Sequence, residues 1–207
     1  MAQYFEIHHE NPQPRLVRQA AQIIQSGGIV AVPTDSAYAL VCRLDDKAAV
    51  EKLRRLRGVD EKHHLTLLVR DLSEISTYAR VDNRQYRLLK AVTPGPYTVI
   101  LDATHEVPRR LSHPSRKTIG IRVPENAILL ALLEELGEPL ICSTLHLPGD
   151  DHMLSDPEEV QERIGKQIDL VIDGGAGTLE PTTIVDLTGT EPVLLREGRG
   201  DPAAFGL

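Results

Sequence analysis

The chain has 207 residues, 41% of them apolar and 26% charged, with a formal net charge of −7 at pH 7. A chain of this length buries roughly 70% of its unfolded surface on folding, so we expect a single domain over residues 1–207. It contains no run of about 18 apolar residues and no signal-peptide pattern at its N-terminus, which argues against a membrane protein and indicates a cytoplasmic one.

Strand-like and helix-like segments alternate along the chain. Apolar, β-rich runs bounded by turn residues predict strands at 4–7, 29–33, 39–42, 65–69, 98–101, 118–123, 139–144, 169–172, 182–187 and 192–196. Capping residues and helical spacing of apolar residues predict helices that begin after Asn11, after Asp45 or Asp46, after Asp71, after Asp82, at Ile128 and at Pro157. The last two strands are close enough to pair antiparallel, so we expect an α/β domain with a mixed sheet.

Polar side chains follow the strand predicted at 29–33. Pro33 cannot donate to a sheet ladder, so the strand ends there, and Thr34, Asp35 and Ser36 follow at once. Ligands of α/β proteins bind at strand ends of this kind. The alternative is an ordinary turn in which Asp35 and Ser36 bond neighbouring amides.

The strand predicted at 118–123 carries a second polar set. Side chains two and four residues apart share one face of a strand, so Thr118, Gly120 and Arg122 point the same way. A glycine between the other two lets a ligand approach the backbone. The alternative for Arg122 is an exposed arginine on an edge strand.

The charges are unevenly distributed. Residues 52–62 hold five bases against two acids, residues 109–122 hold five bases and no acid, and residues 150–186 are strongly acidic. We therefore expect one electropositive and one electronegative face. The second basic run includes Arg109, Arg110, Arg116 and Lys117.

Several motifs are absent. There is no GxxxxGK[ST] phosphate loop, no GxSxG elbow, and none of the eight histidines shows HExxH spacing, so we predict no resident metal. Cys42 and Cys142 lie in apolar stretches without CxxC spacing, which predicts buried thiols.

Seven segments occur in an order that resembles the YrdC/YciO family. They are PTDSAY, Arg55-Leu-Arg57, TPGPYTVIL, TIGIRVP, PLICST with the following LPG, PTTIVDL and LLREG. The resemblance covers about residues 15–200 and is closest to the YciO branch.

This resemblance implies an α/β-twist fold, a large curved mixed parallel/antiparallel sheet with flanking helices and a positive concave face. Members such as YrdC make threonylcarbamoyl-AMP from L-threonine, bicarbonate and ATP with Mg2+, a step toward modified tRNA, and the family is associated with double-stranded RNA and tRNA. Carried over, the threonine-binding residues are Thr34, Thr118, Arg122 and Thr182. The nucleotide-binding residues are Arg55, Arg57, Ser143, Thr144 and Arg196, and the catalytic pair is Arg55 and Arg57.

The chain also departs from the family pattern. The usual lysine is Arg55, the proline expected after Arg57 is Gly58, and a Ser-Thr-Ser-Ala-Asn pattern is replaced at 142–146 by CSTLH. We therefore expect an ATP- and RNA-binding protein with weak or altered synthase chemistry. The alternative is a non-catalytic RNA-binding module that uses the basic runs, with Arg109, Arg110, Arg116 and Lys117 as the RNA-binding surface. A third hypothesis, hydrolysis of ATP or a carbamoyl phosphate-like compound, rests on analogy alone.

Overall fold

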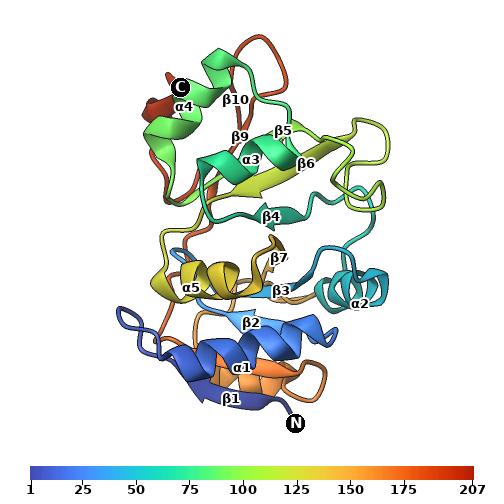
Figure 1. Cartoon of the computed structure of the whole chain (residues 1–207), viewed down its shortest axis with the longest axis vertical. Coiled ribbons are helices and arrows are strands. Elements are labelled where there is room, and N and C mark those ends of the chain that lie inside the picture. Colours follow the sequence, from blue (N-terminus) through green and yellow to red (C-terminus); the bar gives the residue numbers. More distant parts are fainter.

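The computed structural model describes residues 1–207, and every predicted strand and helix is present in it (Figure 1). The strands are β1 Gln3–Glu6, β2 Val30–Val32, β3 Ala39–Arg43, β4 Thr66–Leu68, β5 Tyr97–Asp102, β6 Thr118–Arg122, β7 Leu140–Thr144, β8 Leu170–Asp173, β9 Thr183–Asp186 and β10 Val193–Arg196. The helices are α1 Pro14–Gln25, α2 Lys47–Arg57, α3 Leu72–Tyr78, α4 Asn83–Val92, α5 Ala127–Leu136, α6 Pro157–Ile164 and the 3-10 turn η1 Pro202–Phe205. None of these helices combines the length and apolar character that crossing a membrane requires.

The predicted start of α1 is wrong by two residues. The helix begins at Pro14 rather than Pro12, and Gln13 at its N-cap makes no side-chain cap. Asn11 instead belongs to a turn, where its backbone N–H donates to Nδ1 of His8 over 3.1 Å. Gln13 is extended because a residue before proline is disfavoured in the helical region, so the helix starts one residue later.

The other helix ends follow local chemistry as expected. The side chains of Asp46, Asp71 and Asp82 each accept a backbone N–H of the first turn of α2, α3 and α4. Gly58 and Gly137 end α2 and α5 in the left-handed conformation, with φ of 63° and 68°. A residue with a Cβ is strained at these angles, so glycine stops each helix there.

All ten strands form one sheet in the order β1-β8-β2-β3-β7-β4-β6-β5-β9-β10. The pairs β1–β8, β2–β8, β4–β6 and β5–β9 are parallel, and the pairs β2–β3, β3–β7, β4–β7, β5–β6 and β9–β10 are antiparallel. The predicted mixed sheet is confirmed, as is the antiparallel pairing of the last two strands. The sheet runs along the longest axis of the molecule, with the N-terminus at one end and the C-terminus at the other (Figure 1).

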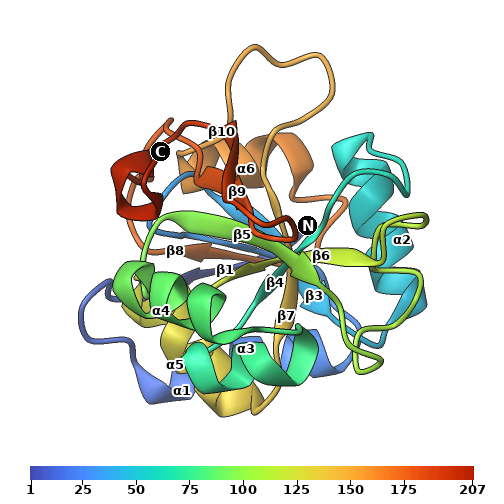
Figure 2. The ribbon, with the colours of Figure 1, turned by 90° about the horizontal axis from the view of Figure 1, so that it is seen from above.

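The twist of the sheet decides which of its faces stays open. Residues paired across neighbouring strands share a face, and the register joins Val41, Cys142, Thr66, Gly120 and Ile100 in one row. At the β3 end this row packs with α1 and α5, whereas α3 and α4 pack on the opposite face at the β5 end. Figure 2 nevertheless shows all four helices on the same side of the molecule. The sheet therefore twists along its length, so that helices on one side of the molecule cover opposite faces at its two ends. Between β7 and β9 none of these four helices covers the row.

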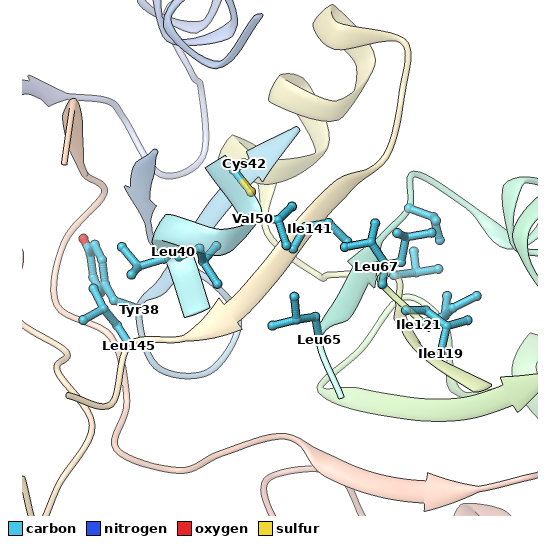
Figure 3. Close-up of a cluster of buried hydrophobic side chains, with 14 of the residues drawn as sticks. Tyr38, Leu40, Cys42, Val50, Leu65, Leu67, Ile119, Ile121, Ile141 and Leu145 are labelled. Carbon is cyan, nitrogen blue, oxygen red and sulfur yellow. The ribbon is translucent and has the colours of Figure 1, made fainter. Parts of the chain in front are cut away.

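The face opposite that row buries the larger hydrophobic core, 33 residues that join β2 to β9 with α2, α3, α4 and α6. Figure 3 shows its centre, where Leu65 and Leu67 flank Ile141 and approach Ile121. Both cysteines are unpaired and buried, which confirms the predicted thiols.

Leu67→Ala is expected to lower the free energy of unfolding by about 2–5 kcal/mol, because Leu67 is fully buried between β6 and β7 and its removal leaves a cavity. Urea denaturation of the two proteins measures the difference. Leu194→Ala is the matched control: Leu194 is 36% exposed on the edge strand β10, and its truncation is expected to change the stability by less than about 0.5 kcal/mol. Equal losses in the two variants would show that this cluster is not the core.

Candidate functional site

A cavity of about 320 Å³ lies on the uncovered part of the sheet. Its wall combines strand residues with the loop after α2 and the connection between β7 and α6, which extends away from the sheet in Figure 2. The lining residues are Arg57, Lys62, His63, His64, Thr66, Thr98, Ile100, Arg122, Cys142, Ser143, Thr144, His146, Met153, Thr182, Ile184, Leu195 and Arg196.

This wall is strongly cationic. It holds three arginines and one lysine, several hydroxyl groups, and no carboxylate side chain. Six residues predicted from different segments meet here: Arg57, Arg122, Ser143, Thr144, Thr182 and Arg196. Cations enclosed by apolar walls attract anions more strongly than they do in water, so the cavity suits a ligand with several negative charges.

Arg122 occupies the centre of this site and is 4% exposed. β6 lies between β4 and β5, so the alternative of an exposed arginine on an edge strand is wrong. Its Nη2 donates to Oδ1 of Asp35, whose Oδ2 accepts the backbone N–H of Glu125 over 3.0 Å. Burial lowers the pKa of Arg122 to about 10, which leaves it charged at neutral pH. Nε of Arg122 is buried without a hydrogen-bond partner in the protein, and the residue lines the cavity.

Arg57 reaches the cavity from the last turn of α2. Its Nε donates to Oγ of Ser143 over 2.9 Å and its Nη1 donates to the carbonyl of His146. Burial lowers the pKa of Arg57 from its ordinary value. These contacts connect α2 to the end of β7, and they use the 142–146 segment in which the chain departs from the family pattern.

Arg196 lies on the opposite wall, at the end of β10. Its Nε and Nη2 both donate to the carbonyl of Thr182, over 3.0 and 2.8 Å, and Nη2 also bonds Oγ1 of Thr182 over 3.0 Å. Oγ1 of Thr182 is in turn 3.0 Å from Oγ1 of Thr98. Burial lowers the pKa of Arg196, and the network holds the guanidinium against one side of the cavity.

The structure does not bring Arg55 to this cavity. Arg55 is exposed and lines a separate groove between α2 and α6, together with Lys52 and Lys166. Residues two apart on a helix point in nearly opposite directions, so Arg55 and Arg57 on α2 do not share a site. The predicted catalytic pair is therefore separated, and Arg57 alone reaches the cavity.

Thr34 lies one layer behind the wall. It is 8% exposed, and its hydroxyl donates to the carbonyl of Ala37 over 2.7 Å. Oγ1 of Thr34 is also 3.0 Å from Oγ of Ser36, and Ser36 is 3.4 Å from Nη2 of Arg122. The turn after β2 thus supports Arg122 through Asp35 and Ser36, while Thr34 holds the turn itself.

Thr118 is also covered, in this case by His64. Thr118 and Arg122 share a face of β6 as predicted, but His64 lines the cavity and its Nε2 is 2.9 Å from Oγ1 of Thr118. The sequence reasoning missed His64 because the loop 58–65 has no helix or strand period. The signal that could have found it was a histidine pair between a basic run and a buried strand.

Two further groups complete the description of the site. Burial raises the pKa of Cys142 to about 11, so it is a protonated thiol rather than a nucleophile at neutral pH.

The predicted RNA-binding residues Arg109, Arg110, Arg116 and Lys117 are all exposed on the connection between β5 and β6. The chain has no group of three or more His, Cys, Asp or Glu side chains arranged to hold a metal ion.

Comparison with known families agrees with this architecture. The family model Sua5/YciO/YrdC, described as telomere recombination, matches residues 22–198. The chain belongs to this family. Its resemblance to the YrdC/YciO family, expected from seven short segments, is thereby confirmed.

Individual relatives fall into two groups. The uncharacterized protein YciO of Escherichia coli K12 is 53% identical over 205 residues, which cover 99% of this chain and 100% of YciO. The crystal structure of Escherichia coli YciO superposes with a TM-score of 0.96, which supports the predicted α/β fold. The mouse threonylcarbamoyl-AMP synthase is 33% identical over 159 residues, which cover 77% of this chain and 55% of the synthase.

A structure of the second group carries a ligand. Sua5 of Pyrococcus abyssi complexed with L-threonine has a TM-score of 0.87 and is 27% identical, covering 94% of this chain and 57% of the Sua5 chain. The chain therefore spans little more than half the length of these synthase relatives. It is related to threonylcarbamoyl-AMP synthases, and at full length it matches YciO.

Proposed function

We propose that this protein is an enzyme of the threonylcarbamoyl-AMP synthase type, with weak activity, that binds ATP with Mg2+, L-threonine and bicarbonate in the cationic cavity. The observation that carries the proposal is the wall of four permanent cations without a carboxylate side chain. The relatives named threonylcarbamoyl-AMP synthase and the threonine complex of Pyrococcus abyssi Sua5 support it.

The cations match the charges of these substrates. The guanidinium of Arg122 is the proposed donor for the carboxylate of threonine, and Arg57 and Arg196, on opposite walls, are the proposed partners of the phosphates. A hydrogen bond to a charged group contributes roughly 1.5–3 kcal/mol. Three such bonds supply about 5–9 kcal/mol, and micromolar binding requires about 8 kcal/mol. The cavity can therefore hold a nucleotide without a phosphate loop.

The reaction needs little covalent work from the protein. Threonine and bicarbonate give the N-carboxylate of threonine and water, and an oxygen of this carbamate then attacks the α-phosphorus of ATP. The bond from that phosphorus to the bridging oxygen breaks, and pyrophosphate leaves. Cations already fixed around the phosphates stabilise the charge of the transition state.

The 142–146 segment explains why the proposed activity is weak. Nε2 of His146 is 2.7 Å from the carbonyl of Asp150, and the carbonyl of His146 accepts from Arg57. These groups are committed to holding the connection between β7 and α6. The asparagine of the family pattern offers an amide donor and acceptor at this position, and the histidine has fewer free groups for a nucleotide.

Labelled ATP, Mg2+, threonine and bicarbonate incubated with the pure protein test this proposal. We expect pyrophosphate release that requires both threonine and bicarbonate and that is slower than that of a full-length synthase measured in parallel. Omission of threonine is the control for simple ATP hydrolysis. Pyrophosphate release at the same rate with and without threonine, or no release at all, would contradict the synthase proposal.

A second function, binding of double-stranded RNA or tRNA, is favoured by the basic loop between β5 and β6. Four exposed bases at 109–117 lie on one connection, and Arg116 lies close enough to His64 to disfavour its charged form.

Contacts to phosphate weaken steeply with salt, so filter binding of tRNA is expected to fall as salt rises. Replacing Arg109, Arg110 and Arg116 with glutamate should abolish binding at low salt, and unchanged binding would exclude this surface.

A further inference from the structure

The cavity lacks a partner for a protonated amine, a fact that matters if threonine is the substrate as proposed above. Its wall has four permanent cations and no carboxylate side chain. Like charges disfavour an ammonium group there and favour the neutral amine. Carbamate formation needs the same species, because the ammonium nitrogen has no free electron pair. The site therefore requires a group that accepts a proton from threonine.

Few groups on the wall are able to accept that proton. The Cys142 thiol is protonated and buried, and His63 forms hydrogen bonds only through its backbone, so no contact orients its ring. His146 belongs to the end of the cavity that Arg57 occupies, and its Nε2 is engaged with a backbone carbonyl. His64 is half-buried on the wall and bonds Thr118, which shares a strand face with Arg122.

We propose that His64 is the general base that deprotonates the substrate amine, and that Thr118 is a positioning residue that orients it. Nε2 of His64 is 2.9 Å from Oγ1 of Thr118, and its Nδ1 has no partner in the protein. When Nε2 donates to the hydroxyl, the neutral ring carries its free electron pair on Nδ1. The ring also lies against that of His113 in a tilted arrangement, with centroids 5.1 Å apart and planes inclined by 31°.

Burial and the charges around His64 keep its imidazole neutral, so that it is free to accept a proton. Burial is the main cause that lowers its pKa below the ordinary value, and His113 and Arg116 of the β5–β6 connection lower it further. Asp186 of β9 acts weakly in the opposite direction. Lys62 and His63, which precede His64 on its own loop, also line the cavity. At neutral pH the imidazole is thus an acceptor rather than a fifth cation.

In the proposed proton transfer, the ammonium of threonine gives one proton to Nδ1 of His64, which yields the neutral amine and an imidazolium. The amine nitrogen bonds to the carbon of bicarbonate, and the carbamate anion and one water result. The imidazolium returns its proton to solvent, so the enzyme ends unchanged and no oxidant or reductant is consumed.

His64→Gln tests this role by removing the titrating group and keeping a polar side chain. At pH 7 we expect kcat for threonine-dependent pyrophosphate release to fall roughly 100-fold or more, as for loss of a general base, with KM for ATP unchanged. The wild-type rate should fall on the acid side as His64 is protonated. The rate of the variant should follow instead the fraction of free threonine amine in solution, so its deficit should shrink as the pH rises toward about 9.

Two further variants separate the base from a structural role. Thr118→Val keeps the shape of the side chain and removes the hydroxyl, so the acid limb is expected to persist at a lower kcat. His105→Gln, on an exposed residue of the β5–β6 connection that does not line the cavity, is expected to leave both the rate and its pH profile unchanged. A pH profile of His64→Gln identical to that of the wild type would overturn the proposal and leave the synthase activity standing.

A binding measurement keeps this inference distinct from the proposed function. Imidazole NMR signals of the full-length protein, assigned with His64→Gln and His105→Gln, are titrated with pH with and without threonine. We expect threonine to shift the His64 signals and to leave those of His105, outside the cavity, in place. A shift without pyrophosphate release would overturn the synthase function alone. Release by the wild type with no effect on His64 would overturn the base.

Discussion

Replacing Arg122 with glutamine is expected to lower the free energy of unfolding by about 3–5 kcal/mol and to abolish threonine binding. The change leaves the carboxylate of Asp35 buried without its cation, and an unpaired buried charge is strongly destabilising. It also removes the guanidinium of a residue that lines the cavity. Urea denaturation and calorimetry with threonine measure the two effects on one protein sample.

The double variant Asp35→Asn/Arg122→Gln separates stability from binding. An amide pair removes both charges, so most of the lost stability should return, whereas threonine binding should stay absent because no guanidinium is present. A single variant as stable as the wild type would show that the pair is not buried as described. Threonine binding by the double variant would exclude Arg122 as the carboxylate partner.

Replacing Arg57 with glutamine is expected to weaken ATP binding about 10- to 150-fold, the equivalent of one charge-assisted hydrogen bond of about 1.5–3 kcal/mol. Arg57 lines the cavity and is held by Ser143 and His146. Calorimetry with ATP and Mg2+ measures the change, and thermal denaturation checks that the variant remains folded.

Arg55→Gln is the matched control on the same helix. Arg55 is exposed in the groove between α2 and α6, so its loss should change ATP affinity by less than about twofold. The family resemblance placed both arginines at the phosphates, whereas the structure separates them. A larger loss of affinity with Arg55→Gln than with Arg57→Gln would move the nucleotide to that groove.

Local chemistry made much of the fold predictable. Capping aspartates and helix-ending glycines placed α2, α3, α4 and α5, and the run of β-rich segments placed all ten strands. The error at the start of α1 had a local cause as well: two prolines compete for the first turn, and Pro14 takes that position. The strand order was not predictable, because pairs such as β1–β8 join segments about 165 residues apart.

Only part of the site was predictable, because its contacts also join segments that lie far apart in the sequence. Alternation along a strand placed Thr118 with Arg122, but burial of Arg122 depends on neighbours that only the sheet order supplies. Asp35 was visible as a turn residue, and its ion pair with Arg122 joins segments 87 residues apart. Helical geometry predicts that Arg55 and Arg57 point in different directions, but the prediction followed the family motif, which places both at one site.

A crystal structure of the protein with threonine and a non-hydrolysable ATP analogue would show where both ligands bind. We expect the threonine carboxylate within hydrogen-bond distance of Arg122, the phosphates between Arg57 and Arg196, and the amine beside His64. Ligand density in the groove of Lys52 and Arg55, or an empty cavity at saturating ligand in solution, would contradict it.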